Sequence, residues 1–237
     1  MFPIRDDAPR YSTPYVTYFI IALNAVVFLF ELSVGMQSHR QLNALISEFG
    51  VVPLRFERAL SGPAVVSLPS ISLTILTSMF LHGGWLHIIG NMWFLYIFGD
   101  NVEDYLGHFK YLVFYLLSGG AAAIAYIFLD FGSRQPTIGA SGAIAGVMGA
   151  YFVLYPKARV LTLVFLIVFF TFWWLPAWVF LGYWFLLQFL SGTATSIAET
   201  QSSGGIAFWA HVGGFVAGIL LIKLLPERPR RYRYATW

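Results

Sequence analysis

Cysteine is absent from this chain of 237 residues, and charged side chains make up only 11% of it. Without cysteine the chain has no thiol nucleophile, no disulfide and no thiolate ligand for a metal. Soluble domains usually carry about 25% charged residues, so the low charge content argues against a soluble protein. Hydrophobic residues make up 58% of the chain, and its length suits one membrane domain of several spans.

The amino-terminal stretch, MFPIRDDAPRYSTP, lacks the features of a cleaved signal peptide. It carries two acidic residues before the first apolar run, and no small-residue cleavage site follows that run. Between Arg10 and Glu31 lie 20 uncharged residues, and a spanning helix needs about 20. We therefore expect a cytoplasmic tail at residues 1–14, followed by a retained first span at about residues 15–34.

The remaining apolar runs predict five more spans, at about residues 84–100, 111–129, 142–155, 177–191 and 208–225. Residues 35–75 are of mixed polarity and rich in proline and glycine, which predicts a long loop with short interfacial helices. The expected fold is therefore all-α, a polytopic bundle of six transmembrane helices over residues 15–225. A basic cytoplasmic tail at residues 226–237 follows it.

Basic residues support this topology with the amino terminus inside the cell, because cytoplasmic loops carry an excess of Lys and Arg. Four of the 14 basic residues then lie outside: Arg40, Arg55, Arg58 and Arg134. The basic cluster between Arg228 and Arg233 lies inside and could contact anionic lipid head groups. We expect it to act chiefly as a topology anchor.

Ser141 stands out because it lies at the mouth of the fourth predicted span, in the sequence TIGASGAIAG. Gly139 and Gly142 would allow a tight turn and a close approach by a substrate. The N-terminus of the following helix offers free N–H groups to a developing anion. This pattern alone is weak, because small residues in membrane helices more often mean tight packing.

His211 lies near the start of the last span, in WAHVGGFVAG. Gly214 and Gly218 form a small-residue face on that span, as Gly142 and Gly146 do on the fourth. If the two faces meet, His211 and Ser141 come together at the same depth. A neutral imidazole within hydrogen-bonding distance of a serine can act as its general base.

The uncharged region 160–197 could hold one span or two, because Pro176 divides it into short halves. The fourth and last spans start on the same side only if one returning span separates them. We therefore expect a single span at about residues 177–191. Residues 160–176 are then an apolar segment in or near the membrane interface.

A third group of polar residues lies at the start of the second span, in HGGWLHIIGN. His87 and Asn91 are four residues apart and share one face of a helix. Two histidines and an amide could in principle bind a metal, but the cluster lacks both an HExxH motif and a carboxylate. We favour a donor set in which the His N–H and the Asn amide stabilise an oxyanion. No metal or cofactor is expected.

In combination, HGGWLHIIGNMWFLYIFGDNVED, then GASG, then AHVGGFVAG resembles the rhomboid intramembrane serine proteases over about residues 70–222. The resemblance implies that Ser141 is the nucleophile, His211 the base, and His87 and Asn91 the oxyanion donors. It also implies a supporting role for His82 and a structural role for Glu103. Family members work with a Ser–His dyad, without an aspartate.

The sequence departs from the family pattern at two places. The long loop lacks a Trp-Arg pair that many members carry. The residue four positions after the serine is often aromatic and stacks on the base histidine, but here it is Ala145. Another group, such as Trp209 or a water molecule, would then orient His211.

The expected function is hydrolysis of peptide bonds in or near the transmembrane segments of single-span membrane proteins. Two alternatives stay open: an inactive rhomboid-like protein that binds membrane clients, and a small-solute channel or transporter lined by the intramembrane polar residues. The expected location is the inner membrane of a prokaryotic cell, with both termini cytoplasmic. The lipid bilayer is an expected partner and nucleic acid is not, while the oligomeric state is left open.

Overall fold

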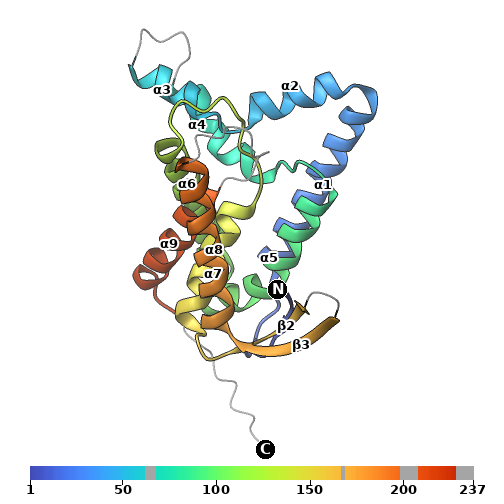
Figure 1. The fold of residues 1–237 in the computed structure, drawn as a ribbon, viewed down its shortest axis with the longest axis vertical. Coiled ribbons are helices and arrows are strands. Elements are labelled where there is room, and N and C mark those ends of the chain that lie inside the picture. Colours follow the sequence, from blue (N-terminus) through green and yellow to red (C-terminus); the bar gives the residue numbers. More distant parts are fainter. Residues whose placement is uncertain (62–67, 167–168, 198–207, 228–237) are drawn as a thin grey trace, which may run out of the picture.

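The computed structural model describes residues 1–61, 68–166, 169–197 and 208–227 and is mostly helical (Figure 1). Each of the six predicted spans corresponds to one helix. These helices are α1 (Tyr15–Gln37), α5 (Trp85–Leu106), α6 (His108–Leu129), α7 (Ser141–Leu154), α8 (Ala177–Ile197) and α9 (Phe208–Leu224). The largest differences are the ends of α5 and α8, each six residues beyond the prediction.

Within the described residues, three helices are long and apolar enough to cross a membrane by themselves: α1, α6 and the Ala177–Ala194 part of α8. A fourth crossing results if Pro69–Phe80 and α5, which meet at a bend of 82°, form one span. Helices α7 and α9 are apolar but shorter, with 14 and 17 residues. The chain is thus a polytopic helical membrane protein, and the count of six crossings stays a prediction.

Helix α7 lies at the centre of the bundle, in contact with α5, α6 and α9. All of its residues from Gly142 to Tyr151 are buried. Small side chains make this possible, because they let neighbouring helix backbones approach closely. The candidate nucleophile is therefore the first residue of the most enclosed helix.

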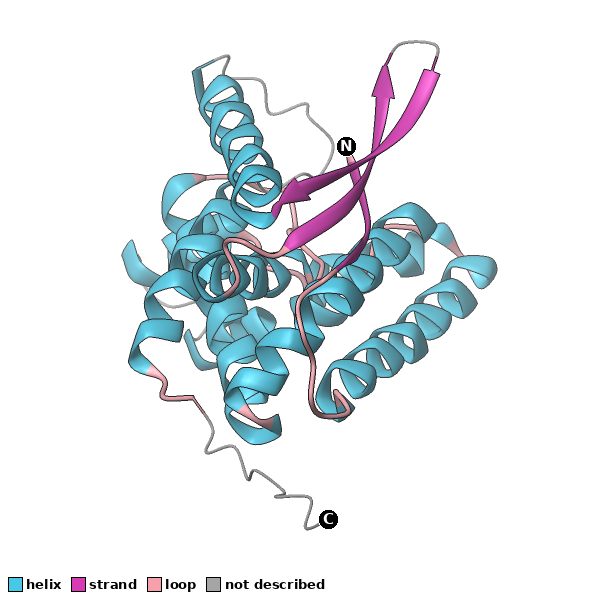
Figure 2. Cartoon of the chain, turned by 90° about the horizontal axis from the view of Figure 1, so that it is seen from below, coloured by secondary structure: helices cyan, strands magenta, loops and turns pink. Residues whose placement is uncertain are grey.

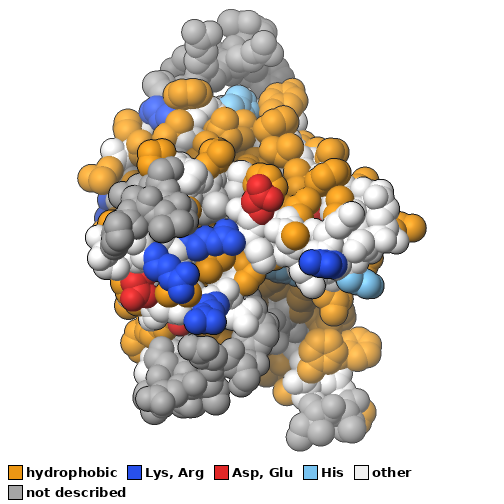
Figure 3. Space-filling model, turned by 90° about the horizontal axis from the view of Figure 1, so that it is seen from above, with side chains coloured by type: hydrophobic (Ala, Val, Ile, Leu, Met, Phe, Trp, Pro, Cys, Tyr) orange, Lys and Arg blue, Asp and Glu red, His pale blue; other side chains and the backbone are white. Residues whose placement is uncertain are grey.

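The long loop after α1 contains α2 (His39–Phe49), α3 (Pro53–Ser61), α4 (Leu68–Thr77) and a 3-10 helix at Ser78–Phe80. These elements lie at the end of the molecule away from the amino terminus (Figure 1). Seen from that end, basic and polar side chains lie among apolar ones (Figure 3). Val51 and Thr137 exchange two backbone hydrogen bonds of 3.0 and 2.8 Å, which tie the loop to the segment that leads into Ser141.

A small antiparallel sheet, which the sequence did not predict, lies at the other end of the helical bundle (Figure 2). Strands β1 (Phe2–Asp6), β2 (Arg159–Leu166) and β3 (Phe169–Pro176) pair in the order β1-β2-β3. Val160, Thr162 and Val164 are buried, as the two-residue period of a strand requires. The segment 160–176 therefore does not cross the membrane as a helix, and α8 alone returns the chain from α7 toward α9.

The stretch before α1, predicted as a tail, is docked on the helices. Tyr151 donates a hydrogen bond to Asp6, and Arg10 pairs with Asp100 at 3.0 Å. The indole N–H of Trp93 donates to the Pro3 carbonyl at 2.7 Å. Burial raises the pKa of the Asp6 carboxyl, although the Tyr151 hydrogen bond opposes this shift. Residues 2–10 thus hold the sheet against α5, from Trp93 to Asp100, and against Tyr151 of α7.

Glu103 is fully buried near the end of α5. Its carboxylate accepts hydrogen bonds from the Val16 N–H at 2.9 Å and from the Thr17 N–H and hydroxyl at 2.7 Å each. His108 Nδ1, at the start of α6, lies 2.6 Å from Oε1. These contacts tie the first turn of α1 to the junction of α5 and α6, which is the kind of structural role that the resemblance implied.

Candidate active site

Ser141 begins α7 after a turn that only glycine makes without strain. Gly139 has a φ of +124°, in the region that L side chains rarely adopt. A Cβ atom on Gly139 would also lie 2.7 Å from His87 Nε2. The Gly139 N–H donates to the Ser78 carbonyl at 2.8 Å and so fixes the turn. The turn therefore brings His87 and Ser141 to the edge of the same cavity.

The glycine faces of α7 and α9 meet, as their spacing in the sequence suggested. A Cβ on Gly214 would lie 2.1 Å from the Gly142 carbonyl oxygen, and one on Gly218 would lie 1.9 Å from the Gly146 oxygen. The two backbones can approach this closely only because no side chain separates them. Ser141 and His211 both lie near the starts of these helices and are consequently at one depth.

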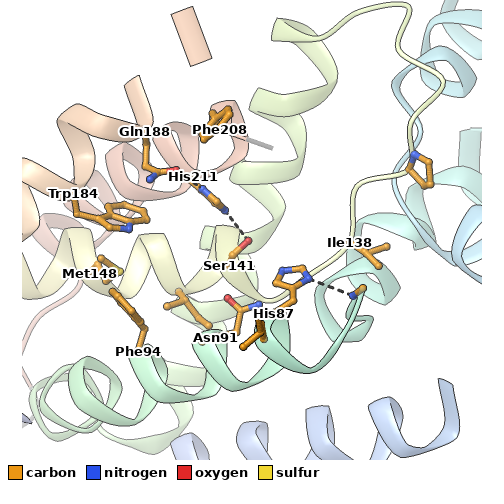
Figure 4. Close-up of a pocket in the computed structure, with 15 residues that line it drawn as sticks. His87, Asn91, Phe94, Ile138, Ser141, Met148, Trp184, Gln188, Phe208 and His211 are labelled. Carbon is orange, nitrogen blue, oxygen red and sulfur yellow. Dashed lines mark hydrogen bonds between the residues drawn. The ribbon is translucent and has the colours of Figure 1, made fainter. Parts of the chain in front are cut away.

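His211 Nε2 lies 2.8 Å from Ser141 Oγ, and His211 Nδ1 lies 2.7 Å from Gln188 Oε1 (Figure 4). If Nε2 accepts the serine proton, the neutral imidazole carries its own proton on Nδ1, which donates to Gln188. Gln188 thus selects the tautomer that a general base needs. The Trp184 ring packs beside the imidazole, with 5.9 Å between centroids.

Sequence reasoning missed Gln188 and Trp184, and it suggested Trp209 or a water molecule to orient His211. Trp209 instead packs against Phe189, with ring centroids 6.0 Å apart. A signal was present, since Gln188 is the one amide within residues 177–191 and polar groups inside spans are costly. Trp184 and Gln188 are also four residues apart and so share a helix face.

His87 and Asn91 lie on the first two turns of α5, on the other side of Ser141 from His211 (Figure 4). The Gly83 N–H donates to His87 Nδ1 at 3.3 Å, so Nε2 carries the proton of the neutral ring. Asn91 Nδ2 is buried and has no hydrogen-bond partner among the described residues. Two N–H donors therefore point toward the space beside Ser141, and one of them is unused.

His82 lies just before α5 and is buried, with its ring edge-on to His87 at 5.1 Å between centroids. Its backbone N–H donates to both carboxylate oxygens of Glu31, at 3.0 and 3.2 Å. Glu31 is itself buried on α1, and sequence reasoning used it only to mark the end of the first uncharged run. The Glu31 contact holds the turn that carries Gly83, and Gly83 in turn orients His87.

A cavity of about 710 Å³ opens onto these groups. Its polar lining is contributed by Ser141, His211, His87, Asn91 and Gln188, and its apolar lining includes Phe94, Ile144, Met148, Trp184 and Phe208. A hydroxyl, a base and amide or imidazole donors thus converge on one apolar-walled space. In the part of the chain that the structure describes, no three His, Asp or Glu side chains are grouped to hold a metal ion.

A family model described as a rhomboid domain matches residues 71–228, which is more than half of the chain. The chain belongs to the rhomboid family. This rhomboid is 32% identical over 120 residues to RHOMBOID-like protein 6, mitochondrial, of Arabidopsis thaliana, a match covering 45% of the chain. It is 29% identical over 169 residues to Rhomboid protein 1, mitochondrial, of Saccharomyces cerevisiae, covering 68% of the chain. It is 28% identical over 157 residues to Rhomboid-like protein 11, chloroplastic, of A. thaliana, covering 65%.

These matches span 38%, 45% and 52% of the relatives' own lengths, so the rhomboid chain corresponds to about half or less of each. The names of these relatives refer to mitochondria and chloroplasts. They agree with a membrane protein but give no support to the expected inner membrane of a prokaryote.

Proposed function

We propose that this rhomboid is an intramembrane serine endopeptidase that cleaves single-span membrane proteins. The observation that carries the proposal is the 2.8 Å contact between Ser141 Oγ and His211 Nε2 at the start of α7. A partly buried serine–imidazole pair beside N–H donors is the arrangement that acyl transfer requires. Family membership supports the reaction class.

In the proposed reaction Ser141 Oγ attacks the scissile carbonyl while His211 Nε2 takes its proton. The same nitrogen then gives the proton to the leaving amine, and a water molecule resolves the acyl-enzyme. Throughout these steps Gln188 Oε1 accepts a hydrogen bond from the N–H at His211 Nδ1. Because helical carbonyls are hydrogen-bonded and hidden, a substrate span must partly unwind before the attack.

Both ends of the domain are proposed to face the cytoplasm. The start of α1 is tied to the α5–α6 junction through Glu103, and Lys110 at that junction donates to the Pro226 carbonyl at 3.3 Å. The start of α1 and the segment after α9 therefore lie at one end of the bundle. Most of the predicted basic tail lies outside the described residues, so its contact with anionic lipid stays a prediction.

The cleavage test uses the purified chain in liposomes with a tagged single-span substrate. Wild type is expected to release a fragment cut within or beside the substrate span. Absence of any cleavage, with several such substrates that differ in their helix-breaking residues, would count against the proposal. It would favour the client-binding alternative.

The oxyanion role of His87 and Asn91 is tested by a double substitution, His87→Ala with Asn91→Ala. Removing one oxyanion donor typically lowers kcat about 10²- to 10³-fold, and we expect the double variant to lose at least that much. The matched control is His39→Ala with Asn43→Ala, an exposed pair at the same spacing on α2. Equal cleavage rates for the two double variants would refute the oxyanion role.

The orienting role of Gln188 is tested by Gln188→Ala. Loss of one hydrogen bond to the base should raise the barrier by about 1.4 kcal/mol, or about tenfold in kcat, with little change in KM. Leu187→Ala removes a comparable volume from the lipid-exposed side of the same helix and should leave kcat near the wild-type value. A Gln188→Ala variant with the kcat of Leu187→Ala would show that Gln188 does not position His211.

A further inference from the structure

The hairpin of β2 and β3 carries the densest group of exposed aromatic side chains on the described surface. In β3, Phe169 is 75% exposed, Phe170 67%, Phe172 53%, Trp173 48% and Trp174 42%. Successive residues of a strand point to opposite faces, so both faces of β3 are aromatic and uncovered. Packing within the protein therefore accounts for the buried residues of β2 but not for the exposed aromatic residues of β3.

The hairpin is joined in sequence to one candidate span and is paired with a strand that precedes another. Pro176 ends β3 and Ala177 begins α8, so the strand leads into a candidate span without a linker. On the other side of the sheet, β1 precedes α1, which is also a candidate span. The hairpin extends sideways from this end of the bundle (Figures 1 and 2). It consequently lies at the level where the apolar helices enter the membrane.

We propose that the β2–β3 hairpin is a lipid-binding element that lies in the head-group region of the bilayer and contacts the acyl chains below it through its aromatic side chains. Tryptophan and other aromatic side chains are favoured at this depth, because one part of the ring is apolar and another is polar. The exposed side of α8 continues from β3 through Trp178, which is 55% exposed.

The depth follows from the backbone of β3. Among the described residues β3 pairs with β2 alone, so its outer edge presents N–H and C=O groups without strand partners. Such groups cannot lie in hydrocarbon, where each unsatisfied group costs several kcal/mol. Head groups and their water can satisfy them. The hairpin must therefore stop above the hydrocarbon core.

Basic residues at the base of the hairpin also favour a position in the head-group region. Arg5 and Arg159 lie over the Trp174 ring, with their guanidinium carbons 5.6 and 5.7 Å from its centroid. Lys157 is exposed in the turn before β2. Lys and Arg side chains favour the phosphate layer and aromatic rings the layer beneath it, so a hairpin that carries both suits the head-group region.

A second copy of the chain could also pair with the outer edge of β3, because uncovered edge strands favour such pairing. Edge pairing would satisfy the backbone but leave the aromatic rings on both faces in water. Lipid covers the rings and supplies the polar groups, so the observations favour it. Pairing between copies is kept as an outcome of the test.

The absence of cysteine makes the test direct, because any introduced thiol is unique. We would make Phe170→Cys, Phe172→Cys and, as the control at the base, Lys157→Cys. Each full-length variant is labelled with a nitroxide and reconstituted into vesicles of phosphatidylcholine and phosphatidylglycerol. Power saturation with oxygen and with a water-soluble nickel complex reports whether each label lies in lipid or in water.

At positions 170 and 172 the ratio of oxygen to nickel accessibility is expected to be several times that at position 157. The labels should report a depth near the head-group boundary rather than the bilayer centre. Two hairpin positions are used so that a local distortion at one of them does not decide the result. Nickel accessibility equal to that of Lys157→Cys at both positions would overturn the proposal. Dipolar broadening between labels, with low access to both reagents, would overturn it in favour of β3 pairing between two copies.

Discussion

Cleavage of a single-span substrate is expected to fall about 10³-fold or more when Ser141 is replaced with alanine. The reason is that Ser141 Oγ, 2.8 Å from His211 Nε2, is the proposed attacking atom, and alanine leaves no oxygen in that position. The fold should be retained, because Ser141 is the first residue of α7 and its side chain fills no closed core space. The measurement compares initial cleavage rates of both proteins in liposomes.

Ser61→Ala is the control for this substitution. Ser61 ends α3, and within the described residues its hydroxyl donates one local hydrogen bond, to the Glu57 carbonyl at 2.6 Å. The control should cleave at nearly the wild-type rate. If Ser141→Ala cleaves as fast as Ser61→Ala, Ser141 is not the nucleophile and the account of the site fails.

Gly218→Ala is expected to have the second-largest effect, on both stability and activity. The new Cβ would lie 1.9 Å from the Gly146 carbonyl oxygen, which belongs to the backbone and cannot rotate away. Helices α7 and α9 must then separate, at a cost of up to about 3 kcal/mol in the free energy of unfolding, as in other overpacked sites. Because a misplacement of about 1 Å can cost 10²-fold in rate, moving His211 away from Ser141 should also reduce cleavage strongly.

Gly120→Ala isolates the packing effect. Gly120 lies inside α6, where a new Cβ would meet only Ile75 Cγ2 at 4.0 Å. Both substitutions gain about 1 kcal/mol of helix propensity, so their difference reports the α7–α9 contact alone. We expect Gly218→Ala to unfold several degrees below Gly120→Ala in detergent. Equal unfolding temperatures and equal cleavage rates would contradict the close packing of the two helices.

The Ser141–His211 pair could be predicted because glycine spacing carries geometric information. Glycines four residues apart mark the helix faces that approach each other, and the position of each polar residue relative to those faces sets its depth. His87 and Asn91 were predictable for a similar reason, because residues four apart on a helix must share a face.

Gln188 could not be placed on His211 in the same way. The side of α8 that faces the bundle depends on how that helix packs against α9, and α8 has no repeated pattern of small residues to mark it. Its amide is a polar group within an apolar segment, but the sequence does not show which group it contacts. The role of Glu31 could not be predicted either, because its partner is the backbone N–H of His82, which is 51 residues away in the sequence.

The hairpin was missed because residues 160–176 are apolar almost without interruption. Periodicity distinguishes a helix from a strand only when polar and apolar residues alternate, and here both sides of β3 are aromatic. The partner strand β1 has only five residues, too few to predict from local pattern. The choice of one span rather than two for 160–197 came instead from the requirement that α7 and α9 start on the same side.

Activity-based labelling is the most direct test of the central claim, because it needs no knowledge of the substrate. A fluorophosphonate probe phosphonylates a serine oxygen only when a base activates it. Wild type in liposomes should be labelled on Ser141, with no labelling of Ser141→Ala and a strong reduction in His211→Ala. Labelling that persists in Ser141→Ala, or wild type that stays unlabelled where a known serine hydrolase reacts, would contradict a Ser141–His211 catalytic pair.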